Sequence, residues 1–561
     1  MPQAYLGWWR QLAGSIVCCL VSAGIVWGQS AESKAAQEEG IPVTDPLVTA
    51  KCGKCHAPDE HGNMQRLSFE RTTPEGWQEV LKQMVLVNQV SLTVSEGRSI
   101  VKYLSTHHGL APEEAKPVMY DVERRIREET NIPSDNLRKV CTRCHSFARP
   151  LSWRRSLEDW RQFAERHGTR YKVPENEETI AYLAKAAPLH TPEWDTWSAG
   201  THTPNLAGRW LVTASIPGRG KFYGEMLVDP AGEDEFNTSV RLTSVSDGSS
   251  IVRSGRSVVY GGYAWRGRSK GNDPASSAPD DLSSETREVL WISPDQSTAE
   301  GRWFWGQYQE FGFDVSLRRA SSDPTLLLID RSSLKNGSQA NRVRLIGDHF
   351  PAQVTSGELD FGAGVTVGRI VSNTASEIVA EVNVAADAPL GRRNVAFRGS
   401  ALPAAVAIYD RVDYVKVSPE SALAAFADRE HKRGYQQFEA IGYQRGADGK
   451  PRTADDVELG PVDVAWSLEV FYKAQGSDSK FVGDMSPTGL FTPTDGSPQN
   501  NFDVWVTATA KDEKNKDGKP LVAKSYLVVT VPAYDFGGRR YVRDLDHWVD
   551  DGPARGAPGQ R

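Results

Sequence analysis

The chain has 561 residues, enough for several hydrophobic cores of ordinary size. Its 65 Lys and Arg residues and 72 Asp and Glu residues give a formal net charge of −7, and the basic residues are dispersed along the chain. Nucleic-acid binding requires a concentrated basic surface, so this composition argues against nucleic acid as a partner.

The first 28 residues resemble a secretory signal peptide. Arg10 precedes an apolar run over residues 12–27, and a small-residue cleavage site lies near Gly28. The run is shorter than the roughly 20 apolar residues of a membrane-spanning helix, and the polar stretch QSAESKAAQEEG follows it directly. We therefore expect residues 1–28 to be removed on export, leaving a periplasmic protein with no membrane anchor.

Two cysteine motifs dominate the region that follows. Cys18 and Cys19 would leave with the signal peptide, and the other four cysteines form two Cys-x-x-Cys pairs, each followed by histidine. The two motifs are Cys52, Cys55, His56 and Cys141, Cys144, His145. This is the attachment pattern of haem c, in which the thiols bind the porphyrin and the histidine binds the iron. Each motif is therefore predicted to bind one covalent haem c.

Two other interpretations of these motifs are less consistent with the sequence. A structural zinc site needs two further ligands nearby, and neither pair has a second Cys-x-x-Cys or His-x-x-x-His within about twenty residues. A thioredoxin-like dithiol would follow a strand and has no use for the histidine.

The distal iron ligands can be predicted from an internal repeat. RTTPEGWQEVLKQM ends at Met84 and RRSLEDWRQFAERH ends at His167, and in each a tryptophan precedes the last residue by seven positions, close to the same helix face. We predict Met84 as the distal ligand of the first haem and His167 as that of the second, which gives the first haem the higher potential. Other candidates are Met64, His61, His107 and His108 for the first iron, and His190 and His202 for the second.

The repeat predicts an all-α dihaem cytochrome c domain over residues 40–204, made of two tandem modules at about 40–115 and 120–204. After it, short alternating strands separated by Gly, Asp and Ser turns predict all-β domains. Residues 205–320 are expected to form a β-barrel-like domain, with GRW at 208–210 and again at 301–303 on strands that meet at closure. Residues 321–413 and 414–535 are each expected to form an immunoglobulin-like β-sandwich, followed by a tail over 536–561.

Together these motifs resemble one family, the α subunits of quinohemoprotein amine dehydrogenases. The resemblance rests on KCGKCH, RTTPEGW with Met84, CTRCHSFAR, RRSLEDW with His167, and GRGKFYGEM and YGGYAWRGR in the barrel. It implies a heterotrimer with a propeller-like β subunit and a small γ subunit. The γ subunit of this family carries cysteine tryptophylquinone, which oxidises a primary amine to an aldehyde and ammonia. This chain would then pass electrons through its two haems to a soluble cytochrome c or blue copper protein.

Two other classes of function remain open from the sequence. No nucleophile with its base is evident outside the haem region, so no catalytic residue is expected on this chain. A dihaem peroxidase would need one iron to release its distal ligand and admit peroxide. A docking protein would have haem sites that accept no electrons.

Overall fold

The structure is a computed structural model that describes residues 39–119, 132–142, 146–172, 177–271, 281–305, 311–427, 433–471, 481–496 and 500–531. The predicted signal peptide, Cys144, His145 and the predicted tail lie outside the described residues. Within these ranges, no helix has both the length and the apolar character needed to cross a membrane.

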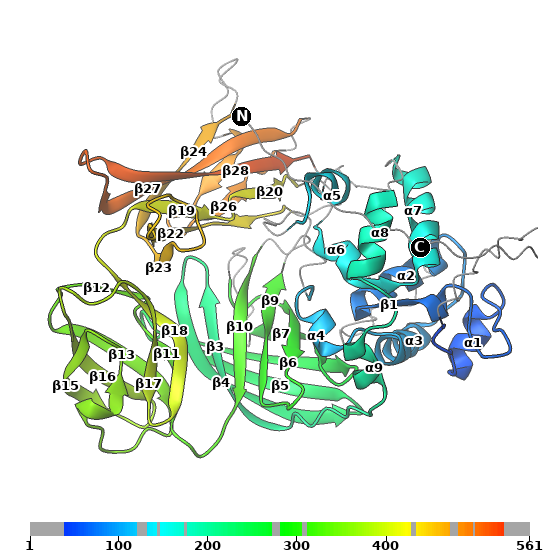
Figure 1. The fold of residues 1–561 in the computed structure, drawn as a ribbon, viewed down its shortest axis with the longest axis horizontal. Coiled ribbons are helices and arrows are strands. Elements are labelled where there is room, and N and C mark those ends of the chain that lie inside the picture. The colour runs from blue at the N-terminus through cyan, green and yellow to red at the C-terminus, as the bar shows by residue number, and fades with distance from the viewer. Residues whose placement is uncertain are drawn as a thin grey trace, which may run out of the picture. The chain divides into compact units, whose positions relative to one another are not determined.

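The part of the chain that contains both cysteine motifs folds as two similar segments, residues 40–119 and 132–198 (Figure 1). The first segment contains α1 (Pro46–Cys52), the 3-10 helix η1 (Leu67–Phe69), β1 (Glu70–Thr72), α2 (Pro74–Leu86), α3 (Val94–His107) and α4 (Pro112–Ala115). The second segment contains α5 (Asp135–Cys141), α6 (Ala148–Leu151), β2 (Trp153–Arg155), α7 (Leu157–Tyr171), α8 (Glu177–Ala186) and α9 (Pro192–Ser198).

Matching residues of the repeat begin the two long helices. The side chain of Thr73 accepts a hydrogen bond from Gly76 N at the start of α2, and that of Ser156 accepts one from Asp159 N at the start of α7. Each side chain satisfies one of the backbone N–H groups that a helix leaves without a partner in its first turn. The two helices therefore begin at the same position of the repeat.

The two segments are joined by an antiparallel ribbon between β1 and β2, in which Arg71 is directly opposite Arg154. These arginines are the first residues of the aligned RTTPEGW and RRSLEDW motifs, so the ribbon places matching positions on either side of a local two-fold axis. The indoles obey the same symmetry. Trp77 Nε1 donates to His108 O at 2.9 Å, and Trp160 Nε1 donates to Ala187 O at 3.1 Å.

The expectation of an all-α dihaem domain followed by separate all-β domains is wrong. Strand outweighs helix in the structure, at 44% against 20%, and the β1–β2 ribbon lies at the centre of the region expected to be wholly helical. A three-residue strand is too short to show the alternation that identifies strands in a sequence. In addition, one hydrophobic cluster extends from Val43 in the first segment to Leu317 in the last barrel strand, so the two regions share a core.

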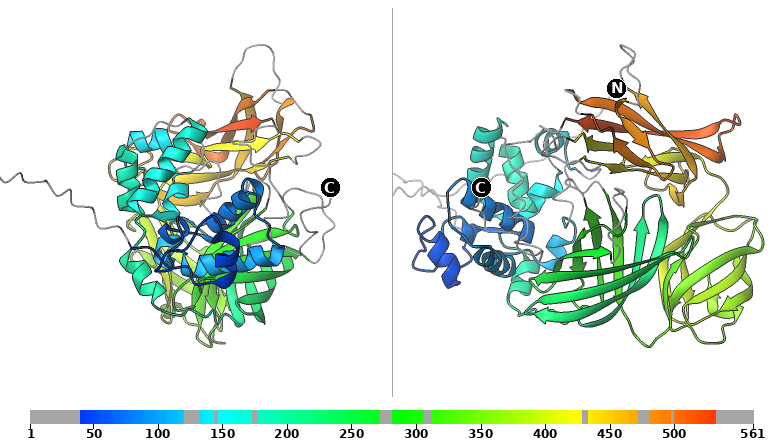
Figure 2. Two further views of the ribbon diagram at one scale, coloured as in Figure 1. Left: turned by 90° about the vertical axis from the view of Figure 1, so that its right-hand side faces the viewer. Right: turned by 180° about the vertical axis from the view of Figure 1, so that it is seen from behind.

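Residues 208–319 form a closed antiparallel barrel with the strand order β10-β3-β4-β5-β6-β7-β8-β9. The strands are β3 (Gly208–Ile216), β4 (Gly220–Gly232), β5 (Glu235–Ser244), β6 (Ser250–Tyr260), β7 (Ala264–Gly271), β8 (Thr286–Ile292), β9 (Thr298–Trp305) and β10 (Phe311–Arg319). Figure 2 shows them from behind, in green, curving round on themselves. The first GRW lies on β3 and the second on β9, and β10 pairs with both of these strands.

Polar contacts connect the first segment to the barrel. The Tyr263 hydroxyl donates to Leu110 O at 2.9 Å, and Trp291 Nε1 donates to Pro112 O at 2.8 Å. Arg266 of β7 forms an ion pair with Glu75, in the first turn of α2. Although burial alone would raise the pKa of Glu75, the adjacent Arg266 lowers it, so Glu75 is held as a carboxylate.

The third region, residues 325–409, forms two four-stranded sheets, β11-β13-β16-β15 and β12-β18-β17-β14. The two sheets enclose a hydrophobic core of their own. These strands are β11 (Thr325–Ile329), β12 (Ser333–Lys335), β13 (Asn341–Asp348), β14 (Leu359–Asp360), β15 (Val365–Asn373), β16 (Glu377–Val384), β17 (Gly391–Phe397) and β18 (Ser400–Tyr409), with the 3-10 helix η3 (Ser356–Glu358) before β14. Strand β12 pairs with β18 in parallel.

The fourth region differs from the expected two-sheet sandwich because its strands form three sheets, β19-β22-β23, β20-β28-β27-β24 and β21-β26-β25. The strands are β19 (Tyr414–Ser418), β20 (Ser421–Ala425), β21 (Gln436–Gln437), β22 (Glu439–Gln444), β23 (Val457–Pro461), β24 (Val464–Val470), β25 (Gly483–Met485), β26 (Leu490–Pro493), β27 (Phe502–Lys514) and β28 (Pro520–Thr530).

Candidate functional site

The first cysteine motif lies in a tight turn at the end of α1. The Asp45 side chain caps this helix, and the backbone N–H groups of Cys55 and His56 both donate to Cys52 O, at 3.1 and 2.9 Å. Cys52 is half-buried, Cys55 is exposed, and both are free thiols. Burial, together with the neighbouring Cys55, raises the pKa of Cys52. The turn thus keeps both thiols and the imidazole within a few residues of one helix end, as haem c attachment requires.

The orientation of His56 suits an iron ligand. Its Nδ1 lies 2.9 Å from the carbonyl oxygen of Gln65, which can only accept a hydrogen bond. The proton must therefore be on Nδ1, which leaves the lone pair of Nε2 free to bind a metal. Among the described residues, no group of three or more His, Cys, Asp and Glu side chains could hold a metal ion by itself.

Met84 is half-buried near the end of α2, two turns after the buried Trp77. The side-chain amide of Asn88 donates to Met84 Sδ at 3.4 Å. A thioether sulfur has two lone pairs, so this contact can fix the side chain while one lone pair stays available. Helices α1 and α2 both pack against α3, which places the motif and Met84 on two helices that share one neighbour.

The other candidates for the first iron have different surroundings. Met64 is fully buried in the main hydrophobic cluster. His61 is largely exposed beside Glu60, and the His107 ring packs 4.7 Å from that of Tyr103. His108 is fully buried with its ring edge-on to Trp77, and the backbone of Leu67 and of Pro42 lies close to its ring nitrogens. Burial lowers the pKa of His108 to about 3, so its ring is neutral.

The second motif is described only in part. Helix α5, capped by Ser134, ends at the buried Cys141. His167 lies on α7 between two aromatic rings, 5.4 Å from that of Phe163 and 4.9 Å from that of Tyr171. Burial, and then the nearby Arg149, lower the pKa of His167. Both effects favour the neutral imidazole, the form that binds a metal.

The two other candidates for the second iron are engaged near α9. His190 packs 5.5 Å from the Trp194 ring, and its Nδ1 is 3.7 Å from Asp195. His202 is stacked on Trp197 at 3.4 Å, and its Nε2 lies 2.8 Å from the Trp197 carbonyl oxygen. The Nε2 of His202 is therefore already occupied by a backbone contact.

A row of side chains with π systems joins the two long helices across the ribbon. The rings of Trp77 and Trp153 lie 6.4 Å apart, and the Arg155 guanidinium lies 4.4 Å from the Trp153 ring and 5.0 Å from the Phe163 ring. Phe163 in turn contacts His167. The predicted ligand of the second iron is thus connected by packed side chains to the first segment.

A buried carboxylate at the two-fold axis was missed by sequence reasoning. Glu114 accepts hydrogen bonds from both Arg71 and Arg154, from Thr191 Oγ1 and from Ala111 N. Burial would raise the pKa of Glu114, but the hydrogen bonds and charges of the two arginines outweigh it and lower the pKa to about 2. The sequence showed only that Arg71 and Arg154 occupy matching positions of the repeat, which does not identify Glu114 as their partner.

Four protein-family models match the chain. The description "Quinohemoprotein amine dehydrogenase A, alpha subunit, haem binding" matches residues 43–184. The models for domains II, III and IV of the same alpha subunit match residues 203–320, 323–410 and 415–537. No curated protein matches the sequence significantly.

Solved structures share only local similarity with the chain. A redesigned β-barrel is 17% identical, with 21% of this chain and 92% of that chain covered and a TM-score of 0.17. Extracellular domains 3–5 of Drosophila OTK are 11% identical, with 58% of this chain and 87% of that chain covered and a TM-score of 0.13. No functional conclusion follows from similarity at this level. The four family matches, in contrast, together extend over most of the sequence in the same order as the observed regions. The chain therefore belongs to the alpha subunit family of the quinohemoprotein amine dehydrogenases.

Proposed function

We propose that this chain is the dihaem electron-transfer subunit of a periplasmic amine dehydrogenase complex. Membership of the family supports a haem-binding role within a multisubunit oxidoreductase. The observation that carries the proposal is the contact between His56 Nδ1 and Gln65 O beside two free thiols. Metal-bound histidines typically donate their other ring N–H in this way, and a Cys-x-x-Cys pair directly before the histidine is the attachment pattern of haem c.

Eight residues are proposed to hold two haem c groups. They are Cys52, Cys55, His56 and Met84 for the first, and Cys141, Cys144, His145 and His167 for the second. A bound haem would supply one-electron oxidation and reduction. The residues of this chain orient the ligands, since Gln65 fixes the tautomer of His56 and Asn88 contacts the Met84 sulfur.

The amine chemistry itself is assigned to another subunit. We propose that a small γ subunit carries cysteine tryptophylquinone beside a propeller-like β subunit, and that a cytochrome c or blue copper protein accepts the electrons. Oxidation of a primary amine to an aldehyde and ammonia releases two electrons. Two haem sites with unlike distal ligands would let this chain take them up one at a time. No residue of this chain is proposed to be catalytic.

Haem attachment can be tested by mass. Denatured, acid-extracted protein is expected to keep two haems, and its mass should exceed that of the mature apo chain by two haem groups. Cys52→Ala combined with Cys55→Ala should leave one haem, bound at the second motif. One haem in the unmodified protein, or zinc in stoichiometric amount, would refute the assignment.

The subunit assignment can be tested by purifying the native complex through this chain and weighing its components. We expect two further subunits, with redox-active quinone staining on the smaller one. A chain that purifies alone, turns over peroxide and has one five-coordinate iron would instead indicate a dihaem peroxidase.

A further inference from the structure

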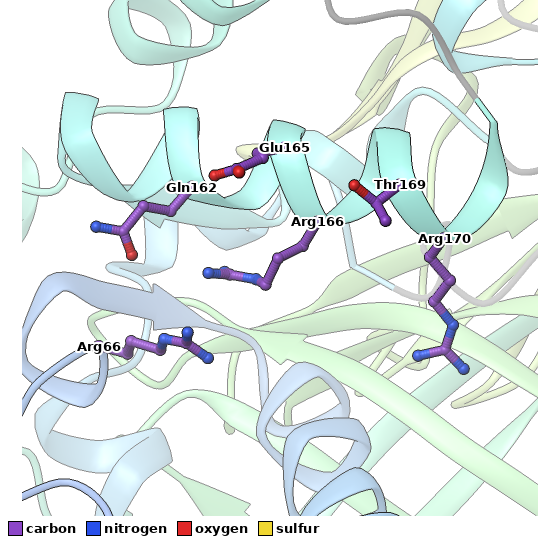
Figure 3. Close-up of a pocket in the computed structure, with 6 residues that line it drawn as sticks. All are labelled: Arg66, Gln162, Glu165, Arg166, Thr169 and Arg170. Atoms are coloured by element: carbon purple, nitrogen blue, oxygen red, sulfur yellow. The ribbon is translucent and has the colours of Figure 1, made fainter.

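A pocket of about 430 Å³ lies between the first segment and α7, and none of the proposed haem ligands lines it (Figure 3). Its lining residues are Arg66, Gln162, Glu165, Arg166, Thr169 and Arg170. Figure 3 shows Arg66 approaching from the first segment, while Arg166 and Arg170 extend from α7 on the same side of the helix. Three guanidinium groups from two separate parts of the chain therefore face one pocket.

No hydrogen bond or ion pair links these guanidinium groups to a carboxylate among the described residues, while the charges of Glu70 and Asp159 act on Arg166 from nearby. Arg66 and Arg166 make no hydrogen bond or ion pair there, and Arg170 contacts only the ring of Tyr171, at 5.5 Å. Glu165 is the one acidic residue of the lining. The lining itself therefore carries a formal charge of +2, and Glu70 and Asp159 add negative charge close to Arg166.

Two carboxylates outside the pocket lining, Glu70 and Asp159, act on Arg166 by their charge. Glu70 forms an ion pair with Arg155, and the Asp159 carboxylate accepts a hydrogen bond from Ser156 Oγ at 2.9 Å. Arg66 and Arg166 line the same pocket, and an anion bound between two guanidinium groups reduces their mutual repulsion.

The backbone at Arg66 supports a role for its side chain. Arg66 has a φ of 69°, in the region where a side chain is disfavoured and glycine is the usual residue. The strained conformation directs the side chain toward α7. It also follows Gln65, whose carbonyl oxygen holds His56.

Most of the α7 residues that line the pocket point away from the face of the predicted iron ligand. Gln162, Arg166 and Thr169 are spaced four and three residues apart and share one face. Phe163 and His167 lie about 100° further round the helix. Arg170, three residues after His167, lies between these two faces, so the pocket extends toward the side of α7 that bears His167.

We propose that this pocket binds a small oxyanion with about two negative charges, such as inorganic phosphate, and that the bound anion joins the Arg66 loop to α7. Guanidinium groups bind phosphate and carboxylate oxygens in bidentate geometry, and a concave site allows several of them to reach one ligand. The anion would connect the loop that positions His56 with the helix that bears His167. This inference does not depend on the proposed electron-transfer function.

The test is isothermal titration calorimetry of the full haem-containing chain with inorganic phosphate. Chloride is used to keep the ionic strength constant. We expect saturable binding of one phosphate and a higher thermal unfolding midpoint in its presence. Arg66→Gln and Arg166→Gln should each weaken binding by about tenfold or more, since each removes a charged hydrogen-bond donor. Arg66→Lys keeps the charge but loses the bidentate geometry. Its affinity for phosphate should lie between that of these two variants and that of the parent protein.

Arg161→Gln is the matched control. Arg161 lies on the same helix, outside the pocket, and pairs with Glu177 at 3.5 Å. Its replacement changes the net charge equally and should leave phosphate affinity unchanged. The proposal is overturned if the parent chain shows no saturable binding, or if Arg161→Gln weakens binding as much as Arg66→Gln. It is also overturned if binding is lost in the assembled complex, since a partner would then cover the pocket.

Discussion

Replacing Glu114 with glutamine is expected to destabilise the folded protein by about 3–5 kcal/mol, the usual cost of removing one partner from a buried ion pair. Arg71 is fully buried and Arg154 is 8% exposed, and the β1–β2 register places them directly opposite each other. Like charges in a cross-strand pair repel, and the Glu114 carboxylate is the group that compensates both. A glutamine amide would keep the volume but lose the charge and one acceptor.

The pKa of Glu114 gives an independent value for the same contribution. A carboxyl group with a pKa of 4.5 in the unfolded chain and about 2 in the folded protein stabilises the fold by about 3 kcal/mol when ionised. Because the folded-state pKa is the lower one, this stability is present above pH 4.5 and is lost as the pH falls toward 2. The glutamine variant should lack this part of the acid dependence.

The assay is urea unfolding at pH 7 and pH 3, followed by far-UV circular dichroism and by haem absorbance. Glu96→Gln is the matched control, because Glu96 is in the same segment and pairs with Lys51 at the surface, with side chains 28% and 30% exposed. Exposed pairs contribute little, so its effect should be much smaller. If Glu114→Gln lowers the free energy of unfolding no more than Glu96→Gln, the carboxylate does not compensate the two arginines as argued.

Further predictions concern the two long helices. Thr73→Ala and Ser156→Ala should each cost about 1 kcal/mol, because each removes the N-cap of its helix; amide exchange should accelerate in the first turn of that helix alone. Burial raises the pKa of Asp159 from its usual 3.8 to about 6. The folded protein therefore holds the Asp159 proton more tightly than the unfolded chain does, and the stability that this contributes below pH 3.8 is lost as the pH rises through 6. Asp159→Asn should therefore raise the unfolding midpoint at pH 7.5 more than at pH 4, and an equal change at both values would contradict this. Met84→Ala should lower the potential of the first haem in a redox titration and leave the spectrum of the second unchanged. His167→Ala should open the second iron to added imidazole, and a bis-histidine spectrum that survives this change would exclude His167.

Short-range features of this chain could be predicted from the sequence because their chemistry is local. The Cys-x-x-Cys-His motifs contain their attachment groups within five residues, and Thr73 and Ser156 mark the helix starts that follow them. In the barrel, successive residues of β5 alternate between buried and exposed, with Val240 buried and Ser239 exposed. This pattern follows from the geometry of a single strand and needs no knowledge of its partners.

The sequence did not determine how these elements meet. Three features depend on hydrogen bonds between distant segments. They are the pairing of β1 with β2, the closure of the barrel through β10 and the three-sheet arrangement of residues 414–530. Periodicity within one strand indicates which of its faces is buried, but it does not indicate which distant strand pairs with it.

The buried charges show the same division between local and long-range information. Composition places Glu114, Arg71 and Arg154 on the surface, where charged residues usually lie. Their burial became possible only when the ribbon brought the two arginines together and α4 supplied the carboxylate between them. Likewise, Arg66 and Arg166 are a hundred positions apart in the sequence. Only the packing of α7 against the first segment brings both side chains to the same pocket. The sequence by itself determined the haem motifs and the repeat, because these are written in neighbouring residues. The tertiary structure decided the shared core, the central ion pairs and the arginine pocket, because each needs groups from separate segments to be desolvated together.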